Sequence, residues 1–227
     1  MNHLSGLDRL ANNFSVMRHG QSKANVEGII VSRVENDRSG DYGLTELGRK
    51  QALTAAQGCG LPAGTLIFSS DFARARQTAR IVRDQLGAVD VVLAQALRER
   101  CFGAWEGTST DNYARVWAAD EAGTGEAGAT QPDGGQPDGG QPDGGQPDGG
   151  QPDGDEPASA VLDRATALVA DLERRYSGRD ILLVSHGDTL QILQAGFLRM
   201  DPSRHRSLPA LETAEIRQLR LSPPPRT

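Results

Sequence analysis

The sequence of 227 residues is poor in aromatic side chains, which make up only 4% of it, and it contains only two cysteines. Cys59 and Cys101 form neither a disulfide framework nor a cysteine motif with metal-ligand spacing. We therefore expect reduced thiols and a cytoplasmic protein. No apolar run approaches the length of a membrane span, and residues 1–13 lack the apolar core of a signal peptide. These absences argue against membrane proteins and secreted disulfide-rich proteins.

Positive charge is missing from one stretch of the chain. Residues 120–156 contain ten acidic residues and no Lys or Arg. Because the whole chain carries −6 and this stretch carries −10, the remainder carries +4. A mildly basic body suits a small phosphorylated metabolite as ligand, and it is too weakly basic to indicate nucleic-acid binding.

The same stretch contains a short repeat. Residues 131–154 repeat the sequence Gln-Pro-Asp-Gly-Gly five times, with the last copy ending in Asp155. The repeat offers no apolar side chain to bury, so it cannot offset the entropy cost of ordering. We predict a single domain over 1–227, interrupted by a flexible acidic insertion over 120–157. The interpretation that the repeat expanded without acquiring a function is favoured over a role as a tether or a lid.

Short apolar segments alternate with amphipathic ones along the rest of the chain. Strands are predicted over 14–17, 66–68, 89–93, 181–184 and 216–221, and helices over 45–58, 72–86, 159–177 and 188–197. Predicted helix caps are Thr45, Ser69 or Ser70, Ser159, and Asp188 or Thr189. This order predicts an α/β fold, a three-layer α/β/α sandwich with a mostly parallel central sheet. The last strand is predicted at an edge, which would allow a homodimer to form by pairing.

Four segments with reactive or charged side chains follow predicted strands. They are Arg18-His19-Gly20-Gln21-Ser22 with Asn25, Ser70 to Thr78 with Arg74, Leu97 to Gly107 with Glu99, and Val184 to Asp188 with His186 and Gly187. The carboxyl ends of parallel strands share one edge of a sheet, and ligands of open α/β sheets bind there. We therefore expect these four segments to converge on one site.

Together the four segments resemble the signature of the histidine phosphatase superfamily, whose relatives include the phosphoglycerate mutases. The resemblance covers about 14–105 and 159–221. It implies a phosphoglycerate mutase-like fold and an enzyme that hydrolyses small phosphomonoesters through a phosphohistidine, without a cofactor or a metal. The run Phe102-Gly-Ala-Trp-Glu-Gly107 is similar to the phosphatase branch, and Ala24 stands where the mutases carry a tryptophan.

The resemblance also implies roles for individual residues. His19 is the predicted nucleophile, because a neutral imidazole can attack phosphorus. Glu99 is the predicted proton donor, and Asp188, more simply a helix cap, is its rival. The predicted phosphate-binding residues are Arg18, Arg74, His186, Ser22, Asn25 and Gly187. For Ser22, an ordinary loop hydroxyl is the competing interpretation.

The sequence leaves two alternative functions open. One is a 2,3-bisphosphoglycerate-dependent phosphoglycerate mutase. The other is a catalytically silent phosphate-binding scaffold that uses the acidic repeat as a tether. Intact His19, Arg74, Glu99 and His186 argue against the scaffold.

Overall fold

A five-stranded sheet lies at the centre of the computed structural model, which describes residues 1–37, 40–123 and 154–224. The strand order is β3-β2-β4-β1-β5, with all neighbours parallel except β5, which runs antiparallel to β1. The bounds are β1 Asn13–Arg18, β2 Leu66–Ser69, β3 Val91–Leu93, β4 Asp180–Ser185 and β5 Ile216–Leu219. The predicted α/β fold with a mostly parallel sheet is confirmed, and β5 lies at an edge as expected.

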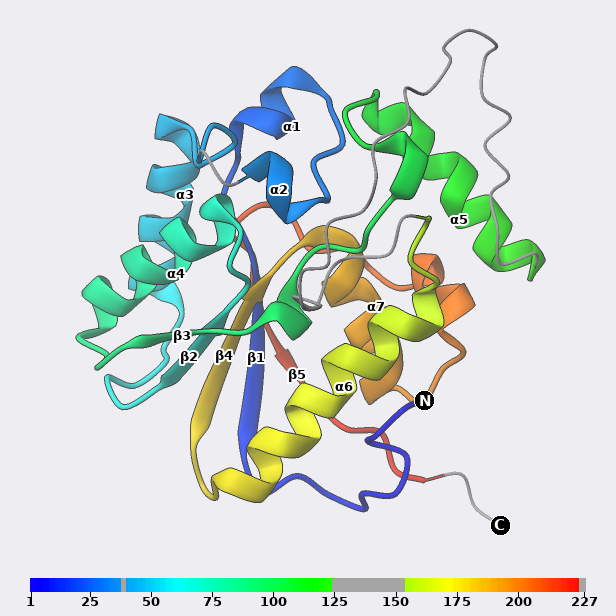
Figure 1. Ribbon diagram of the computed structural model, residues 1–227. Helices are drawn as coiled ribbons and strands as arrows, with labels where there is room; N and C mark the ends of the chain where they lie inside the picture. The colour runs from blue at the N-terminus through cyan, green and yellow to red at the C-terminus, as the bar shows by residue number, and fades with distance from the viewer. Residues whose placement is uncertain (38–39, 124–153, 225–227) are drawn as a thin grey trace, which may run out of the picture.

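Two pairs of long helices cover the two faces of the sheet (Figure 1). Helices α3 (Glu46–Gly58) and α4 (Ala73–Leu86) pack on one face, and α6 (Ala158–Arg175) and α7 (Gly187–Phe197) pack on the other. No helix within the described residues is long and apolar enough to cross a membrane.

Strand β4 explains why both faces are covered. Ile181 and Leu183 pack in the cluster that includes α6 and α7, whereas Leu182 and Val184 pack in the cluster that includes α3 and α4. All four side chains are fully buried. Successive side chains of a strand point to opposite faces, so a continuous apolar run requires helices on both sides.

Shorter elements gather at the carboxyl ends of the parallel strands (Figure 1). They are α1 (Lys23–Glu27), α2 (Val34–Asp37), α5 (Tyr113–Ala122), and the 3₁₀ turns η1 (Gln95–Leu97), η2 (Gly103–Trp105), η3 (Thr110–Asn112) and η4 (Pro202–Ser207). This is the edge at which the sequence predicts a site.

The start of α4 is capped differently from the prediction. Its N-cap residue is Phe72, which supplies no side-chain hydrogen bond, so the predicted cap at Ser69 or Ser70 is wrong. The backbone N–H of Ala73 instead donates to the carboxylate of Asp37, which arrives from α2. A carboxylate at a helix N-terminus is favourable for the helix dipole. It therefore replaces the local cap that the sequence suggested.

Two other predicted caps are also wrong. Helix α6 begins after Pro157 rather than at Ser159, and α7 begins after His186. Asp188 lies inside the first turn of α7, where its carboxylate binds side chains from other elements. The cap at Thr45 is confirmed, since its hydroxyl accepts a hydrogen bond from Gly48 N at 3.0 Å.

Both ends of the predicted acidic insertion have definite contacts. Asp120 is part of α5 and accepts two hydrogen bonds from Arg100, at 2.6 and 2.8 Å. At the other end, Glu156 binds Arg164 at 2.7 Å. These two ends belong to the folded structure, and the intervening 124–153 lie outside the described residues.

Gly48, in the first turn of α3, lies directly against the loop that follows β1. A Cβ atom added there would fall on the carbonyl oxygen of Gln21 and lie 2.8 Å from its nitrogen. This loop carries His19 and Gly20. The absence of a side chain at Gly48 therefore lets α3 hold the loop close to the sheet.

We expect Gly48→Ala to destabilise the protein by about 1–3 kcal/mol or more because of this clash. Propensity alone predicts the opposite sign, since alanine is better than glycine in a helix by about 1 kcal/mol. Gly58 is the matched control, because nothing lies within 4 Å of a Cβ added at that end of the same helix. Urea unfolding measures both variants, and equal midpoints would contradict the packing argument.

Candidate active site

His19 lies just beyond the carboxyl end of β1 and is only 3% exposed. Its Nδ1 is 2.8 Å from the carbonyl oxygen of Gly20, and its Nε2 is 3.1 Å from Nε of Arg74. A carbonyl only accepts and a guanidinium only donates, so the hydrogen is on Nδ1 and the lone pair on Nε2. Burial, followed by the charges of Arg74 and Arg18, holds the pKa of His19 well below its usual value. Near neutral pH, Nε2 is therefore unprotonated, and its lone pair accepts the hydrogen bond from Arg74.

Three donor side chains surround His19. Arg18 Nε, Arg74 Nη1 and His186 Nδ1 are buried, and each finds no hydrogen-bond partner among the described residues. We call these three side chains the donor cup. A buried donor without a partner costs about 1–3 kcal/mol, so such groups are rare without a function. The donor cup is suited to a ligand rich in acceptor oxygens.

His186 follows β4 in the same way that His19 follows β1. The two strands pair in parallel, and the imidazole centroids are 5.2 Å apart. The Ser70 hydroxyl accepts from Phe72 N at 3.3 Å and lies 2.9 Å from His186 Nε2. It can therefore donate its own hydrogen to Nε2, which leaves the imidazole hydrogen on Nδ1, toward the donor cup. Burial, then Arg74 and His19, lowers the pKa of His186 well below its usual value.

The two arginines of the donor cup are each held by a backbone carbonyl. Arg74 Nη2 donates to Val31 O at 2.8 Å, and Arg18 Nη1 donates to Leu211 O at 2.9 Å. Arg74 is also in the first turn of α4, at the end of the helix where the helix dipole is positive. These contacts fix the guanidinium groups before any ligand arrives.

Gly187 provides the space that Arg18 needs. A Cβ added to Gly187 would lie 3.4 Å from both Cζ and Nε of Arg18.

Ser22 and Asn25 bind each other rather than residues of the donor cup. Ser22 is fully buried and forms a capping box with Asn25 at the start of α1, with Ser22 N donating to Asn25 Oδ1 at 2.9 Å. The Asn25 amide nitrogen is free of hydrogen bonds to described residues.

Glu99 is 7% exposed and lies two residues after η1, which separates it from β3. Its Oε1 accepts hydrogen bonds from Arg100 N at 3.0 Å and from Thr189 N at 3.2 Å. Burial raises the pKa of this carboxyl, and the nearby charge of Asp188 raises it further. Glu99 is therefore biased toward its protonated form.

The surroundings of Asp188 favour its ionised form instead. Its Oδ1 accepts from Trp117 Nε1 at 2.9 Å and lies 3.0 Å from His205 Nε2, while Arg100 Nη1 is 3.3 Å from Oδ2. Burial alone would raise the pKa of Asp188, but His205 first, and then Arg100 and Arg206, lower it below its usual value. Two neighbouring carboxyls with pKa values pushed apart can take different roles in proton transfer. Glu99 is therefore suited to donate a proton, and Asp188 is suited to remain negatively charged.

A cavity of about 180 Å³ opens beside Arg18 and Glu99, and we call it the adjoining cavity. The rest of its lining comes from Tyr113, Trp117, Gly187, Asp188, Arg206, Ala210 and Leu211. It is in contact with the donor cup through Arg18. A group attached to an anion held in the donor cup would extend into this space.

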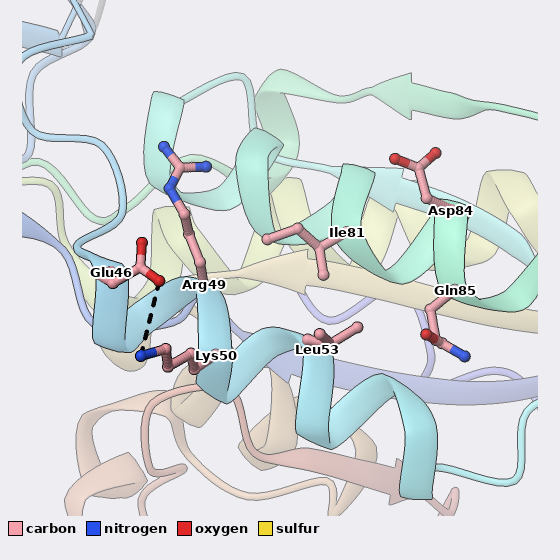
Figure 2. Close-up of a pocket in the computed structure, with 7 residues that line it drawn as sticks. All are labelled: Glu46, Arg49, Lys50, Leu53, Ile81, Asp84 and Gln85. Atoms are coloured by element: carbon pink, nitrogen blue, oxygen red, sulfur yellow. Dashed lines mark ion pairs between the residues drawn. The ribbon is translucent and has the colours of Figure 1, made fainter.

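A larger groove of about 630 Å³ lies elsewhere, between α3 and α4 (Figure 2). It is lined by Glu46, Arg49, Lys50, Leu53, Ile81, Asp84 and Gln85. Lys50 and Glu46 form an ion pair of 3.8 Å there, and none of the predicted site residues lines the groove. Volume alone therefore does not locate the site.

Comparison with known families agrees with this geometry. The family model of the histidine phosphatase superfamily (branch 1) matches residues 14–224. The chain belongs to the histidine phosphatase superfamily. The resemblance that the four segments indicated is thereby confirmed.

Individual relatives of this chain are named either as phosphatases or as mutases. Glucosyl-3-phosphoglycerate phosphatase of Mycobacterium tuberculosis is 29% identical over 90% of this chain and 83% of its own length. A 2,3-bisphosphoglycerate-dependent phosphoglycerate mutase of Bartonella quintana is 33% identical over 47% of this chain, which spans about half (50%) of that relative. The native structure of the mycobacterial glucosyl-3-phosphoglycerate phosphatase superposes with a TM-score of 0.64 at 29% identity, covering 91% of this chain and 88% of that one.

Some residues of the site escaped the sequence analysis. Tyr113, Trp117 and Arg206 line the adjoining cavity, yet none follows a predicted strand. The spacing of Tyr113 and Trp117 was the available signal, because side chains four apart on a helix meet. Their rings stack with centroids 5.4 Å apart. In the described part of the chain, no group of three or more His, Cys, Asp or Glu residues has a metal-binding arrangement.

Proposed function

We propose that this protein is a phosphatase that hydrolyses phosphomonoesters of small molecules through a phosphohistidine at His19. The observation that carries the proposal is the donor cup: three buried nitrogen atoms without partners belong to side chains that lie around His19, whose Nε2 accepts from Arg74 Nε. Phosphoryl transfer depends mainly on positioning and on neutralising the charge of the phosphoryl oxygens. Two guanidinium groups and a neutral imidazole meet both needs for a phosphate dianion.

The first step forms the phosphoenzyme. The lone pair of His19 Nε2 attacks phosphorus while the bond from phosphorus to the ester oxygen breaks. Glu99 gives its proton to the departing oxygen, so an alcohol rather than an alkoxide leaves. The phosphorylated imidazole is now cationic, and its Nδ1–H keeps its hydrogen bond to the Gly20 carbonyl.

The second step reverses the proton transfer. The Glu99 carboxylate accepts a proton from a water molecule as that water attacks phosphorus. The bond between phosphorus and Nε2 breaks and its electron pair returns to His19. Inorganic phosphate leaves, and both His19 and Glu99 regain their starting forms.

Hydrolysis is favoured over mutase activity for two reasons. The relative named as a phosphatase aligns with 90% of this chain, whereas the relative named as a mutase aligns with 47%. Ala24 also replaces the tryptophan that the mutases carry at this position. Conversion of 3- to 2-phosphoglycerate that depends on 2,3-bisphosphoglycerate and outpaces hydrolysis would favour the mutase. A cytoplasmic location and pairing of two copies through β5 stay predictions.

We expect the purified protein to release phosphate from p-nitrophenyl phosphate at the same rate with and without EDTA. Arg18 and Arg74 supply the positive charge that a metal would otherwise provide. Phosphate release is measured in metal-depleted buffer, with Mg²⁺ added back as the control. A rate that vanishes in EDTA and returns with Mg²⁺ would contradict this mechanism. No turnover under any condition would favour the scaffold.

A further inference from the structure

The main chain around Glu99 has no regular structure of its own. Residues 98–101 belong to no helix or strand, yet Glu99, Arg100 and Cys101 are buried. Buried backbone N–H and C=O groups outside helices and strands need partners from side chains, other loops or water. The partners found here therefore decide how firmly the main chain that carries Glu99 is held.

One guanidinium group binds the main chain on the N-terminal side of Glu99. Arg164, on α6, donates from Nη1 to Ala96 O at 2.7 Å and to Arg98 O at 3.0 Å. Its Nη2 donates to the carbonyl oxygen of Glu99 itself at 3.4 Å. Three carbonyls within four residues are thus bound by a single side chain.

A carboxylate binds the main chain on the C-terminal side of Glu99. Glu156 N donates to Cys101 O at 2.8 Å, and Cys101 N donates to Glu156 Oε2 at 3.2 Å. The same carboxylate accepts from Arg164, from Nε at 2.7 Å and from Nη2 at 3.0 Å. Two parallel charge-assisted hydrogen bonds of this kind fix the plane of a guanidinium. We call Arg164 and Glu156 the brace pair, because together they bind the main chain on both sides of Glu99.

The position of the Glu99 carboxyl matters for the chemistry. Glu99 lines the adjoining cavity, whereas neither residue of the brace pair does. A general acid must lie within hydrogen-bond reach of the ester oxygen that departs. A displacement of about 1 Å in an active site can lower the rate by about 100-fold. A brace outside the cavity can therefore control catalysis without touching the substrate.

We propose that Arg164 and Glu156 are positioning residues, which hold the main chain of Glu99 so that its carboxyl meets the departing ester oxygen. This inference rests on the proposed function, which gives Glu99 the role of the acid. It also gives a task to one end of the predicted acidic insertion, since Glu156 is the last of the ten acidic residues in 120–156.

Replacing Arg164 should have an effect that depends on the leaving group. For Arg164→Gln we expect kcat/KM for glycerol 3-phosphate to fall by about 10- to 100-fold, because the acid is displaced. The fall for p-nitrophenyl phosphate should be much smaller, since its phenolate leaves without a proton. In a Glu99→Gln background, Arg164→Gln should lower kcat/KM for glycerol 3-phosphate no further, because the group that it positions is gone. Phosphate release measures all four proteins.

Arg164→Lys separates the position of the main chain from the charge of the side chain. The charge of Arg164 also contributes to lowering the pKa of His186. Lysine keeps that charge, but it lacks the planar group that binds three carbonyls and a carboxylate together. The lysine variant should therefore lose activity toward glycerol 3-phosphate in the same selective way as the glutamine variant.

Arg174→Gln is the matched control, because Arg174 is an exposed arginine of the same helix that pairs with Asp171. It should keep wild-type kinetics, and thermal melting checks that every variant is folded. Equal losses with both esters in Arg164→Gln, or a further loss in the Glu99→Gln background, would overturn the positioning role. So would wild-type activity in Arg164→Gln or Arg164→Lys. If the wild type hydrolyses neither ester, the proposed function itself fails.

Discussion

Replacing His19 by alanine should lower kcat/KM for p-nitrophenyl phosphate by on the order of 10⁴-fold or more, because the covalent route is lost. The reason lies in the hydrogen bonds of the ring. Gly20 O fixes the hydrogen on Nδ1, and Arg74 is oriented at Nε2, so the lone pair is held in one place. The second imidazole of the site, His186, belongs to the donor cup itself, with Nε2 at the Ser70 hydroxyl and Nδ1 without a partner among the described residues.

His3→Ala is the control for this variant. His3 is partly exposed and pairs with Asp163, so it should keep wild-type activity. The wild type, quenched at alkaline pH during turnover, should gain the mass of one phosphoryl group. That mass should be absent from His19→Ala and should be lost on acidification, as expected for a phosphoramidate. Equilibrium dialysis with inorganic phosphate should still detect binding by His19→Ala, since Arg18 and Arg74 remain. Retained turnover in His19→Ala would disprove the mechanism.

The donor cup was largely predictable because its members are placed by strands. His19 follows β1 and His186 follows β4, and each strand is recognisable as a short apolar run. The parallel register pairs Arg18 with Ser185, so the residues that come next emerge side by side. Arg74 reaches the same edge because β2 is the other neighbour of β4. Position along a strand was enough to bring these side chains together.

The hydrogen-bond network around Glu99 and Asp188 was not predictable in the same way. Asp188 looks like a helix cap in the sequence, but its partners Trp117, Arg100 and His205 come from other segments. Asp37 caps α4 from 36 residues away. Polar side chains bind whichever partner the fold supplies, and local sequence does not encode a contact across such separations. The roles of Ser22 and Asn25 are similarly divided between the helix cap and the proposed phosphate site.

Glu99→Gln is expected to act selectively, according to the leaving group. For glycerol 3-phosphate the departing alkoxide needs a proton, so kcat/KM should fall by about 10²- to 10⁴-fold, the usual range for general acid catalysis. For p-nitrophenyl phosphate the departing phenolate is already stable, so the fall in kcat/KM should be much smaller. Glutamine keeps the acceptor oxygen for Arg100 N and Thr189 N, so the fold should survive. Equal losses with both esters would remove Glu99 from the acid role.

The pH dependence of kcat/KM shows whether Glu99 acts as a general acid or has only a structural role. Because kcat/KM reports the phosphorylation step, Glu99 must be protonated, and activity should decline as pH rises through its pKa. Burial and Asp188 raise that pKa, which moves the alkaline limb of the profile upward from that of an ordinary glutamate. The limb should disappear in Glu99→Gln. In Asp188→Asn, where the neighbouring negative charge is gone, it should move to lower pH. A limb that stays in place in both variants would mean that another group carries the proton.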